Sequence, residues 1–122
     1  MKKKILVIED DFPLASALKN KLSKEGFSVR VARNGKSGLE TFVSYKPDLI
    51  LLDIVMPIMD GMEMLRLLRL EPSGKEAKVI VLTNLNDAAK TAQAVQRGVR
   101  DYLVKSDWKM ADLIKKVKEK LK

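Results

Sequence analysis

The sequence predicts an α/β fold in which a parallel sheet is covered by helices on both faces. Five short, largely apolar segments alternate with five segments of helical periodicity along the 122 residues. Residues 49–52 carry no polar side chain, as expected for a strand buried on both faces. No repeat, linker or low-complexity segment interrupts the alternation, so we expect residues 1–122 to form a single domain.

The first two strands are expected to differ in their place in the sheet. Residues 4–8 are largely apolar, and a helix should follow with Pro13 in its first turn and Gly26 just beyond its end. Residues 27–31 alternate apolar and polar side chains, which is typical of a strand with one less covered face, so we place it at a sheet edge. A second helix follows, marked by Leu39, Phe42 and Val43 and ended by Lys46-Pro47.

The second half of the chain continues the alternation. The third strand ends at Asp53, and Asp60 with Glu63 has the spacing of a capping box that opens a helix near residues 60–70. After a loop with Pro72 and Gly74, an apolar strand at 79–82 ends in Thr83. We expect a fourth helix from residue 86 or 87 through 95, a last strand at 101–105, and a last helix with one apolar face formed by Met110, Leu113, Ile114, Val117 and Leu121.

Composition narrows the classes of protein that fit. There is no cysteine, which excludes disulfides and thiolate metal sites and agrees with a cytoplasmic location. The lysine-rich start imitates a signal peptide, but Glu9 ends the apolar run too early, and no stretch is long enough to span a membrane. The net charge of +8 favours acidic partners only weakly, because lysine also maintains solubility. We interpret the lysines of the last helix as a solvated face.

Polar side chains of complementary character follow four of the predicted strands. Glu9 and Asp10 follow the first strand, Asp53 the third, Thr83 the fourth and Lys105 the fifth. Because the carboxyl ends of parallel strands lie along one edge, we expect these residues to converge. Crowded carboxylates repel one another, and Mg²⁺ with oxygen ligands relieves that repulsion. A hydroxyl and an ammonium supply donors for a phosphoryl group, and an aspartate can form an acyl phosphate. We therefore expect Asp53 to be phosphorylated.

Each of these residues taken alone also has a purely structural interpretation. Glu9, Asp10 and Asp11 could form the polar first turn of a helix, where acids offset the helix dipole. Lys105 could be a solvated edge charge and Thr83 an ordinary strand-end hydroxyl. Neither a cap nor a turn accounts for an acid at Asp53. The joint arrangement favours a site, since four separate strand ends would otherwise supply matching chemistry by chance.

The motifs that carry this chemistry resemble those of a known family. The segments are ILVIEDD at 5–11, DLILLDIVMPIMDG at 48–61, VIVLT at 79–83 and DYLVK at 101–105. In order and spacing they resemble the receiver domain of bacterial two-component response regulators, over essentially the whole chain. The resemblance implies a flavodoxin-like, doubly wound sheet of five parallel strands in the order 2-1-3-4-5 with five helices. It also implies a signalling domain rather than an enzyme.

The resemblance implies specific roles for the residues at the strand ends. Asp53 would accept a phosphoryl group from the phosphohistidine of a sensor kinase or a phosphotransfer protein. Asp10, Asp53 and the backbone carbonyl of Val55 would bind Mg²⁺, with Glu9 acting through water. Thr83 and Lys105 would hold the phosphoryl oxygens, and Tyr102 would turn inward when the threonine moves. The surface of the fourth helix, the last strand and the last helix would then bind a downstream protein or a second receiver.

The chain departs from the family pattern beside the expected phosphoryl pocket. Ser106 follows Lys105 where receivers commonly have proline, and a cis peptide without proline costs about 3 to 4 kcal/mol, so the sequence leaves open whether this peptide is cis or trans. Asn84 stands where a small residue is usual. Val55 and Leu85 are apolar at positions that influence how long the phosphoryl group survives. Neither side chain can position an attacking water, so we expect slow hydrolysis.

Two other classes of function remain as alternatives at this stage. Phosphatases of the haloacid dehalogenase kind also use Mg²⁺ and an aspartyl phosphate, but they place a second acid two residues after the nucleophile, where this chain has Val55. A basic nucleic-acid-binding module would agree with the charge. However, no aromatic platform or recognition-helix signature accompanies that charge, so direct nucleic-acid binding is not expected.

Overall fold

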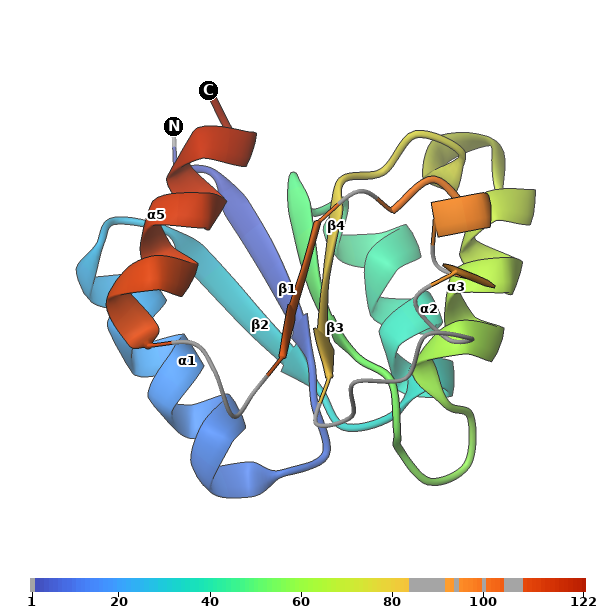
Figure 1. Ribbon diagram of the computed structural model, residues 1–122, viewed down its shortest axis with the longest axis horizontal. Helices are drawn as coiled ribbons and strands as arrows, with labels where there is room; N and C mark the ends of the chain where they lie inside the picture. Colours follow the sequence, from blue (N-terminus) through green and yellow to red (C-terminus); the bar gives the residue numbers. More distant parts are fainter. Residues whose placement is uncertain (1, 84–91, 94, 100, 105–108) are drawn as a thin grey trace.

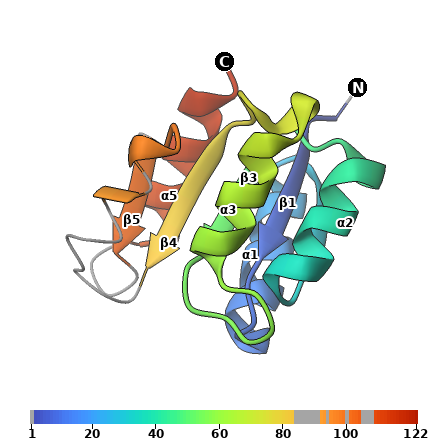
Figure 2. The ribbon, with the colours of Figure 1, turned by 90° about the vertical axis from the view of Figure 1, so that its right-hand side faces the viewer.

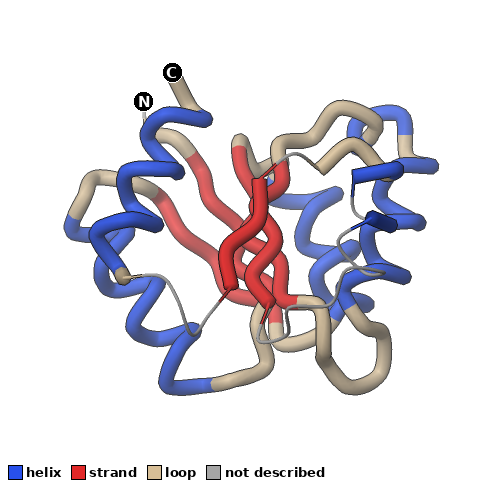
Figure 3. The backbone as a smooth tube through the Cα atoms, in the orientation of Figure 1, coloured by secondary structure: helices blue, strands red, loops and turns tan. Residues whose placement is uncertain are grey.

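A five-stranded parallel sheet forms the centre of the molecule. The computed structural model describes residues 2–83, 92–93, 95–99, 101–104 and 109–122. The strand order is β2-β1-β3-β4-β5, as the family resemblance implies, and every neighbouring pair is parallel. Figure 3 shows the strands, in red, between the helices. The strands are β1 (Lys4–Ile8), β2 (Ser28–Ala32), β3 (Leu49–Asp53), β4 (Val79–Thr83) and β5 (Asp101–Val104).

Helices cover both faces of this sheet in two pairs. Helices α1 (Phe12–Lys24) and α5 (Met110–Lys120) lie on one face, and α2 (Gly35–Tyr45) and α3 (Gly61–Leu70) lie on the other (Figures 1 and 2). A short 3₁₀ helix, η1 (Pro72–Gly74), occupies the predicted loop before β4. Of the predicted fourth helix, residues 92–93 and 95–96 are described and are helical. Its predicted start at Asn86 or Asp87 lies outside the described residues.

Alternate residues of each inner strand contribute to two separate cores. Leu6, Ile50 and Val81 pack on the side of α2 and α3, whereas Val7, Leu51 and Ile80 pack on the side of α1 and α5. This is the period of two expected of a strand. All five residues of β3 are buried, which confirms the prediction that this strand is covered on both faces.

The edge strand confirms one prediction, and the second helix buries only part of the apolar residues that mark it. Strand β2 pairs only with β1 among the described strands, so its predicted place at a sheet edge is confirmed. Val43 does not contribute to the core of α2, because its side chain is 58% exposed. Helix α2 contacts the sheet along one stripe that includes the buried Phe42, and Val43 lies beyond that stripe.

Short polar side chains determine where the helices begin. The carboxylate of Asp11 accepts from the backbone N–H of Leu14 at 3.3 Å, and that of Asp60 accepts from Glu63 at 2.9 Å. Asn34 caps α2 in the same way through the N–H of Ser37. These bonds satisfy backbone donors that the first helical turn leaves free. Each cap follows a strand directly or through a loop, so it also places the chain near the carboxyl edge of the sheet.

Among the described residues, no helix is both long enough and apolar enough to cross a membrane.

Candidate functional site

Three carboxylates meet at the carboxyl edge of the sheet, where β1 and β3 end. One carboxylate oxygen from each of Glu9, Asp10 and Asp53 lies within 4.8 Å of the other two. Glu9 is fully buried and Asp53 is 4% exposed, whereas Asp10 is partly exposed. Glu9 and Asp53 therefore lie inside the fold, and Asp10 lies at the solvent-exposed rim of the cluster. The convergence predicted from the strand ends is confirmed for these acids.

The chain after β1 separates the acids of the cluster from the acid that caps the next helix. The backbone N–H of Glu9 donates to the carbonyl of Ala32 at 3.0 Å, which extends the β1–β2 pairing by one residue. The N–H of Asp11 donates to Oε2 of Glu9 at 3.2 Å, while the Asp11 carboxylate caps α1. Helix α1 has no acid in its first turn, so the alternative that Glu9 and Asp10 offset its dipole there is wrong.

The loop after Asp53 is anchored by close backbone approaches. The N–H of Gly61 donates to the carbonyl of Ile54 at 2.7 Å, and that of Gly35 donates to Met59 at 2.9 Å. A Cβ atom at position 61 would lie 2.2 Å from the backbone oxygen of Asp53, so only glycine fits there. The loop therefore returns tightly over the end of β3, which holds the backbone of Asp53 in place.

An arginine at the rim of the cluster was not anticipated from the sequence. Nη2 of Arg33 donates to the backbone carbonyl of Asp10 at 2.9 Å, and its guanidinium lies 5.1 Å from the ring centre of Phe12. Arg33 follows the end of β2 directly, so it belongs to the same row of strand ends as the acids. A comparison of all five strand ends, rather than four, would have found this signal.

The structure places the other predicted site residues only in part. Val55 follows β3 in the loop and is 56% exposed. Tyr102 lies in β5 and is 46% exposed. Thr83 is the last residue of β4, but its side chain lies outside the described part of the structure. Lys105, Asn84, Leu85 and Ser106 also lie outside the described residues, so their predicted roles stay predictions.

The chemistry of the three acids suits a hard divalent cation. Mg²⁺ prefers carboxylate oxygens and usually keeps several waters. The cluster offers one oxygen from each acid within 4.8 Å, and the partly exposed Asp10 leaves the site open on one side. Oxygen donors, a small separation and access from solvent therefore all fit Mg²⁺.

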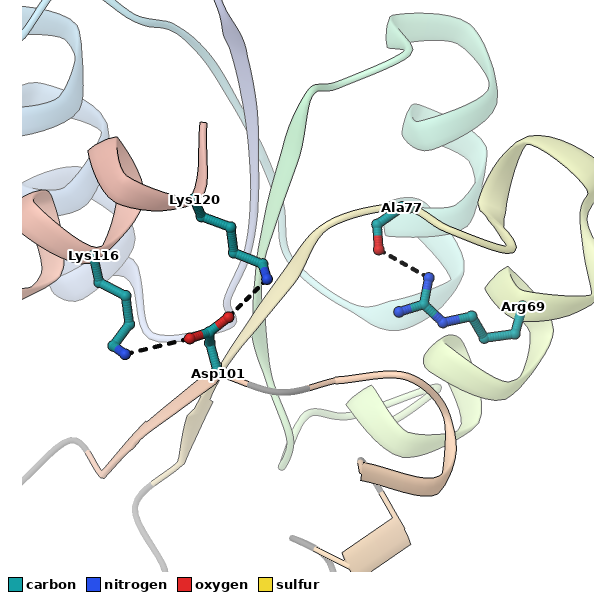
Figure 4. A network of polar contacts seen from close by, with 5 residues as sticks. All are labelled: Arg69, Ala77, Asp101, Lys116 and Lys120. Atoms are coloured by element: carbon teal, nitrogen blue, oxygen red, sulfur yellow. Dashed lines mark hydrogen bonds and ion pairs between the residues drawn. The ribbon is translucent and has the colours of Figure 1, made fainter. Parts of the chain in front are cut away.

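A second polar network joins β5 to α5. Asp101 accepts from Nζ of Lys120 at 2.7 Å and from Nζ of Lys116 at 3.4 Å (Figure 4). The hydrogen bond from Lys120 is the main cause that lowers the pKa of Asp101; partial burial opposes it and Lys116 adds to it. Lys118 likewise donates to Glu25 after α1 at 2.6 Å. Lys116, Lys118 and Lys120 of α5 are thus ion-paired as well as partly exposed, which the interpretation as a solvated face did not include.

Comparison with known proteins assigns the chain and its fold to a family. The sequence pattern of the response regulator receiver domain matches residues 5–118. The chain belongs to this family. Curated relatives include the response regulator MprA of Mycolicibacterium vanbaalenii, 35% identical over 84% of this chain, and MprA of Mycobacterium bovis, 35% identical over 86%. The matches span 43% and 45% of those relatives, so this receiver domain covers less than half of their length.

Solved receiver domains share the whole fold. A CheY-like receiver domain protein of Methanospirillum hungatei is 30% identical, with a TM-score of 0.90 over 99% of this chain and 94% of its own. The BeF₃-activated receiver domain of Klebsiella pneumoniae RstA is also 30% identical, with a TM-score of 0.88 over 98% and 99% of the two chains. The flavodoxin-like fold expected from the resemblance is therefore confirmed.

Proposed function

We propose that residues 1–122 act as one receiver unit, a phosphorylation-dependent switch in which Asp53 is the phosphoacceptor. The meeting of Glu9, Asp10 and Asp53 within 4.8 Å at the carboxyl edge of the sheet carries this proposal. Asp53 is the acid on the central strand β3, and it is almost fully buried.

The chemistry proposed for Asp53 is a phosphoryl transfer from a phosphohistidine. A carboxylate oxygen of Asp53 attacks phosphorus and forms the O–P bond of an acyl phosphate as the P–N bond of the donor breaks. The electron pair of that bond returns to the imidazole, which takes up a proton from solvent. The donor is a sensor histidine kinase or a phosphotransfer protein, which places the reaction in the cytoplasm.

Asp10, Asp53 and the backbone carbonyl of Val55 are the proposed direct ligands of Mg²⁺, with Glu9 acting through water. When bound, Mg²⁺ supplies positive charge beside the oxygens of the transferring phosphoryl group. The tight return of the loop at Gly61 supports this assignment, because it restrains the backbone that carries Asp53 and Val55. Preorganised ligands lose little entropy when the cation binds.

The switch itself is proposed to run through Thr83, Lys105 and Tyr102. Thr83 and Lys105 hold the phosphoryl oxygens, and Tyr102 turns inward as Thr83 moves toward them. The half-exposed ring of Tyr102 supports this, because it has surface left to bury. A phosphate adds about two negative charges, which shifts the population toward the state that binds them better. The output is a changed surface around β5 and α5 that binds a protein target or a second receiver.

The proposal is tested by phosphorylating the protein with acetyl phosphate and Mg²⁺ and measuring the intact mass. The wild type should gain one phosphate, whereas Asp53→Asn should gain none. Asp48→Asn is the matched control, because Asp48 lies at the opposite end of β3 and bonds the N–H of Lys4. EDTA should prevent the gain of phosphate in the wild type and in Asp48→Asn, which both retain Asp53.

Two outcomes would contradict the proposal. A wild type that never gains phosphate, while its circular dichroism spectrum shows a folded protein, would remove Asp53 as an acceptor. Equal gain by Asp53→Asn would move the acceptor to another residue. Hydrolysis of a generic aryl phosphate with many turnovers would favour the phosphatase alternative instead.

A further inference from the structure

A cationic hollow lies at the opposite edge of the sheet from the acid cluster. It has a volume of about 410 Å³ and is lined by Arg66, Arg69, Lys75, Gln96, Arg97 and Gly98. These residues come from α3, from the chain just after η1 and from the segment before β5. Among the described residues that line the hollow, four are cationic and none is acidic. Such a volume is in the range of small-molecule sites.

Arg69 is the fixed cation of this hollow. Its Nε donates to the carbonyl of Arg97 at 2.6 Å, and its Nη1 donates to the carbonyl of Gly74 at 2.8 Å. Nη1 also donates to the carbonyl of Ala77 at 2.9 Å, the contact that Figure 4 draws. The guanidinium is thereby held by three backbone carbonyls on two segments of the chain. Its rotamer is already ordered, so a ligand would not have to order it.

The charge of Arg69 has no carboxylate partner within the described part of the chain. Its described contacts are with carbonyl dipoles only, and its Nη2 donates no hydrogen bond to a described residue. Burial lowers the pKa of Arg69 from its ordinary value, which reflects a charge that is partly removed from water. A partly buried cation of this kind is stabilised by an anion that accepts a hydrogen bond from its remaining nitrogen, Nη2.

Gly98 keeps that donor accessible. A Cβ atom at this position would lie 3.5 Å from Nη2 and 3.6 Å from Nε of Arg69, so a side chain there would pack against the guanidinium. Gly98 also has φ of +85°, a conformation that favours glycine. Gly98 therefore allows the turn before β5 and leaves the guanidinium of Arg69 open to the hollow.

The neighbouring cations increase the positive charge of the hollow. Lys75 is exposed, Arg97 is partly exposed, and Arg66 is ion-paired with Glu63 at 2.6 Å, which offsets one charge. A net positive charge greater than one matches a ligand that carries more than one negative charge. Guanidinium forks also match the geometry of phosphate oxygens.

We propose that the hollow around Arg69 binds a small ligand through its phosphate groups. Inorganic pyrophosphate and a nucleoside triphosphate share this chemistry. The site is separate from Asp53, because it lies beside Ala77, just before β4 begins, whereas the acids lie where β1 and β3 end. Binding would join α3 to the segment before β5.

The proposal is tested by titrating the ¹⁵N-labelled protein with pyrophosphate and, separately, with ATP. EDTA is present to keep metal–phosphate complexes away from the acid cluster, and ionic strength is held at a physiological value. Saturable chemical-shift changes are expected in the backbone of residues 66–75 and 96–98. If pyrophosphate and ATP bind with the same affinity, the protein recognises the phosphate groups alone. If ATP binds more tightly than pyrophosphate, the protein also contacts the nucleoside part of ATP.

Matched charge-removal variants separate a site from the general effect of the +8 charge. The double variant Arg66→Gln/Lys75→Gln should weaken binding about tenfold or more, since each phosphate contact contributes a charge-assisted hydrogen bond. Lys115→Gln/Lys122→Gln removes the same charge from exposed positions on and after α5 and should bind as the wild type does. Equal weakening of both variants, shifts centred on Glu9 to Asp11, or no saturation with either probe would overturn the proposal. So would tighter binding of an aspartate-rich peptide.

Discussion

At the scale of single residues, the geometry around Asp53 depends on the absence of a side chain. Gly61 begins α3, and its N–H bonds the carbonyl of Ile54, directly after Asp53. No rotamer change relieves a clash between a Cβ atom and a backbone oxygen. The position of the proposed phosphoacceptor is therefore set by backbone packing as well as by its own side chain.

Gly61→Ala should destabilise the protein by about 3 kcal/mol, because the added Cβ forces the loop away from β3. Urea denaturation followed by circular dichroism measures the change in the free energy of unfolding. Gly26→Ala is the comparison, since its Cβ would meet no atom within 4 Å but its φ of +97° is strained. That variant should lose only about 1 kcal/mol. Equal losses would mean that the contact with Asp53 is unimportant.

Val55→Asn should shorten the lifetime of the acyl phosphate about tenfold or more, because a polar side chain at the rim can orient an attacking water. The measurement is the decay of the phosphorylated mass after the phosphodonor is removed. Val43→Asn is a matched control, because Val43 is 58% exposed and Val55 56% exposed, and only Val55 lies beside the cluster. Loss of the wild-type phosphate within seconds would contradict the expectation of slow hydrolysis.

At the scale of elements, ion pairs fasten α5 to the rest of the fold. Asp101 in β5 binds two lysines of α5, and Glu25 after α1 binds a third. The hydrogen bond from Lys118 is the main cause that lowers the pKa of Glu25. Leu113 and Val117 already hold α5 on the core through its buried face, so these pairs add orientation to the helix.

Asp101→Asn should lower the free energy of unfolding by about 1 kcal/mol at neutral pH, since two partly exposed pairs are lost. The pKa of Asp101 is lower in the folded protein, so its contribution is complete above the unfolded pKa of about 3.9 and disappears as pH falls through the folded pKa. Urea midpoints of both proteins should therefore converge in acid. Glu40→Gln, an exposed residue without an ion pair among the described residues, should show no such pH-dependent difference.

At the scale of the whole molecule, the sheet separates two helical layers, and the charged sites lie at the ends of its strands. The acids lie at the carboxyl edge, and the cationic hollow lies toward the amino edge. Mutual repulsion of the acids opposes folding, because the unfolded chain lets them separate. A cation that binds only the folded acids should therefore stabilise the entire domain.

Mg²⁺ should raise the melting temperature by several degrees, since a ligand at one hundred times its Kd adds about 2.7 kcal/mol to the free energy of unfolding. Differential scanning calorimetry at constant ionic strength measures the shift. Asp10→Asn should lose most of it, while Glu119→Gln, an exposed acid on α5, should retain it. A melting temperature that does not respond to Mg²⁺ in the wild type would contradict the metal assignment.

Local patterns along the chain were enough to predict most of the architecture. Alternation of apolar runs and helical periods predicted the sheet, its order came from the family resemblance, and the predicted cap at Asp60 acts over three residues. Asp53 could be predicted as a site residue, because a carboxylate at the end of a buried strand costs free energy whatever the position of that strand in the sheet. These features depend on neighbours in the sequence, or on the general rule that parallel strands end together.

Only the tertiary structure decided the contacts between residues far apart in the sequence. Glu25 and Lys118 are 93 residues apart, and Arg69 reaches Arg97 across 28 residues. No periodicity relates such pairs, because their separation depends on how the helices are seated on the sheet. The same cause left Val43 exposed and made Gly98 the opening to Arg69. The sequence by itself determined the elements and the acids at their ends; packing decided which surface charges are paired and which cation faces an open hollow.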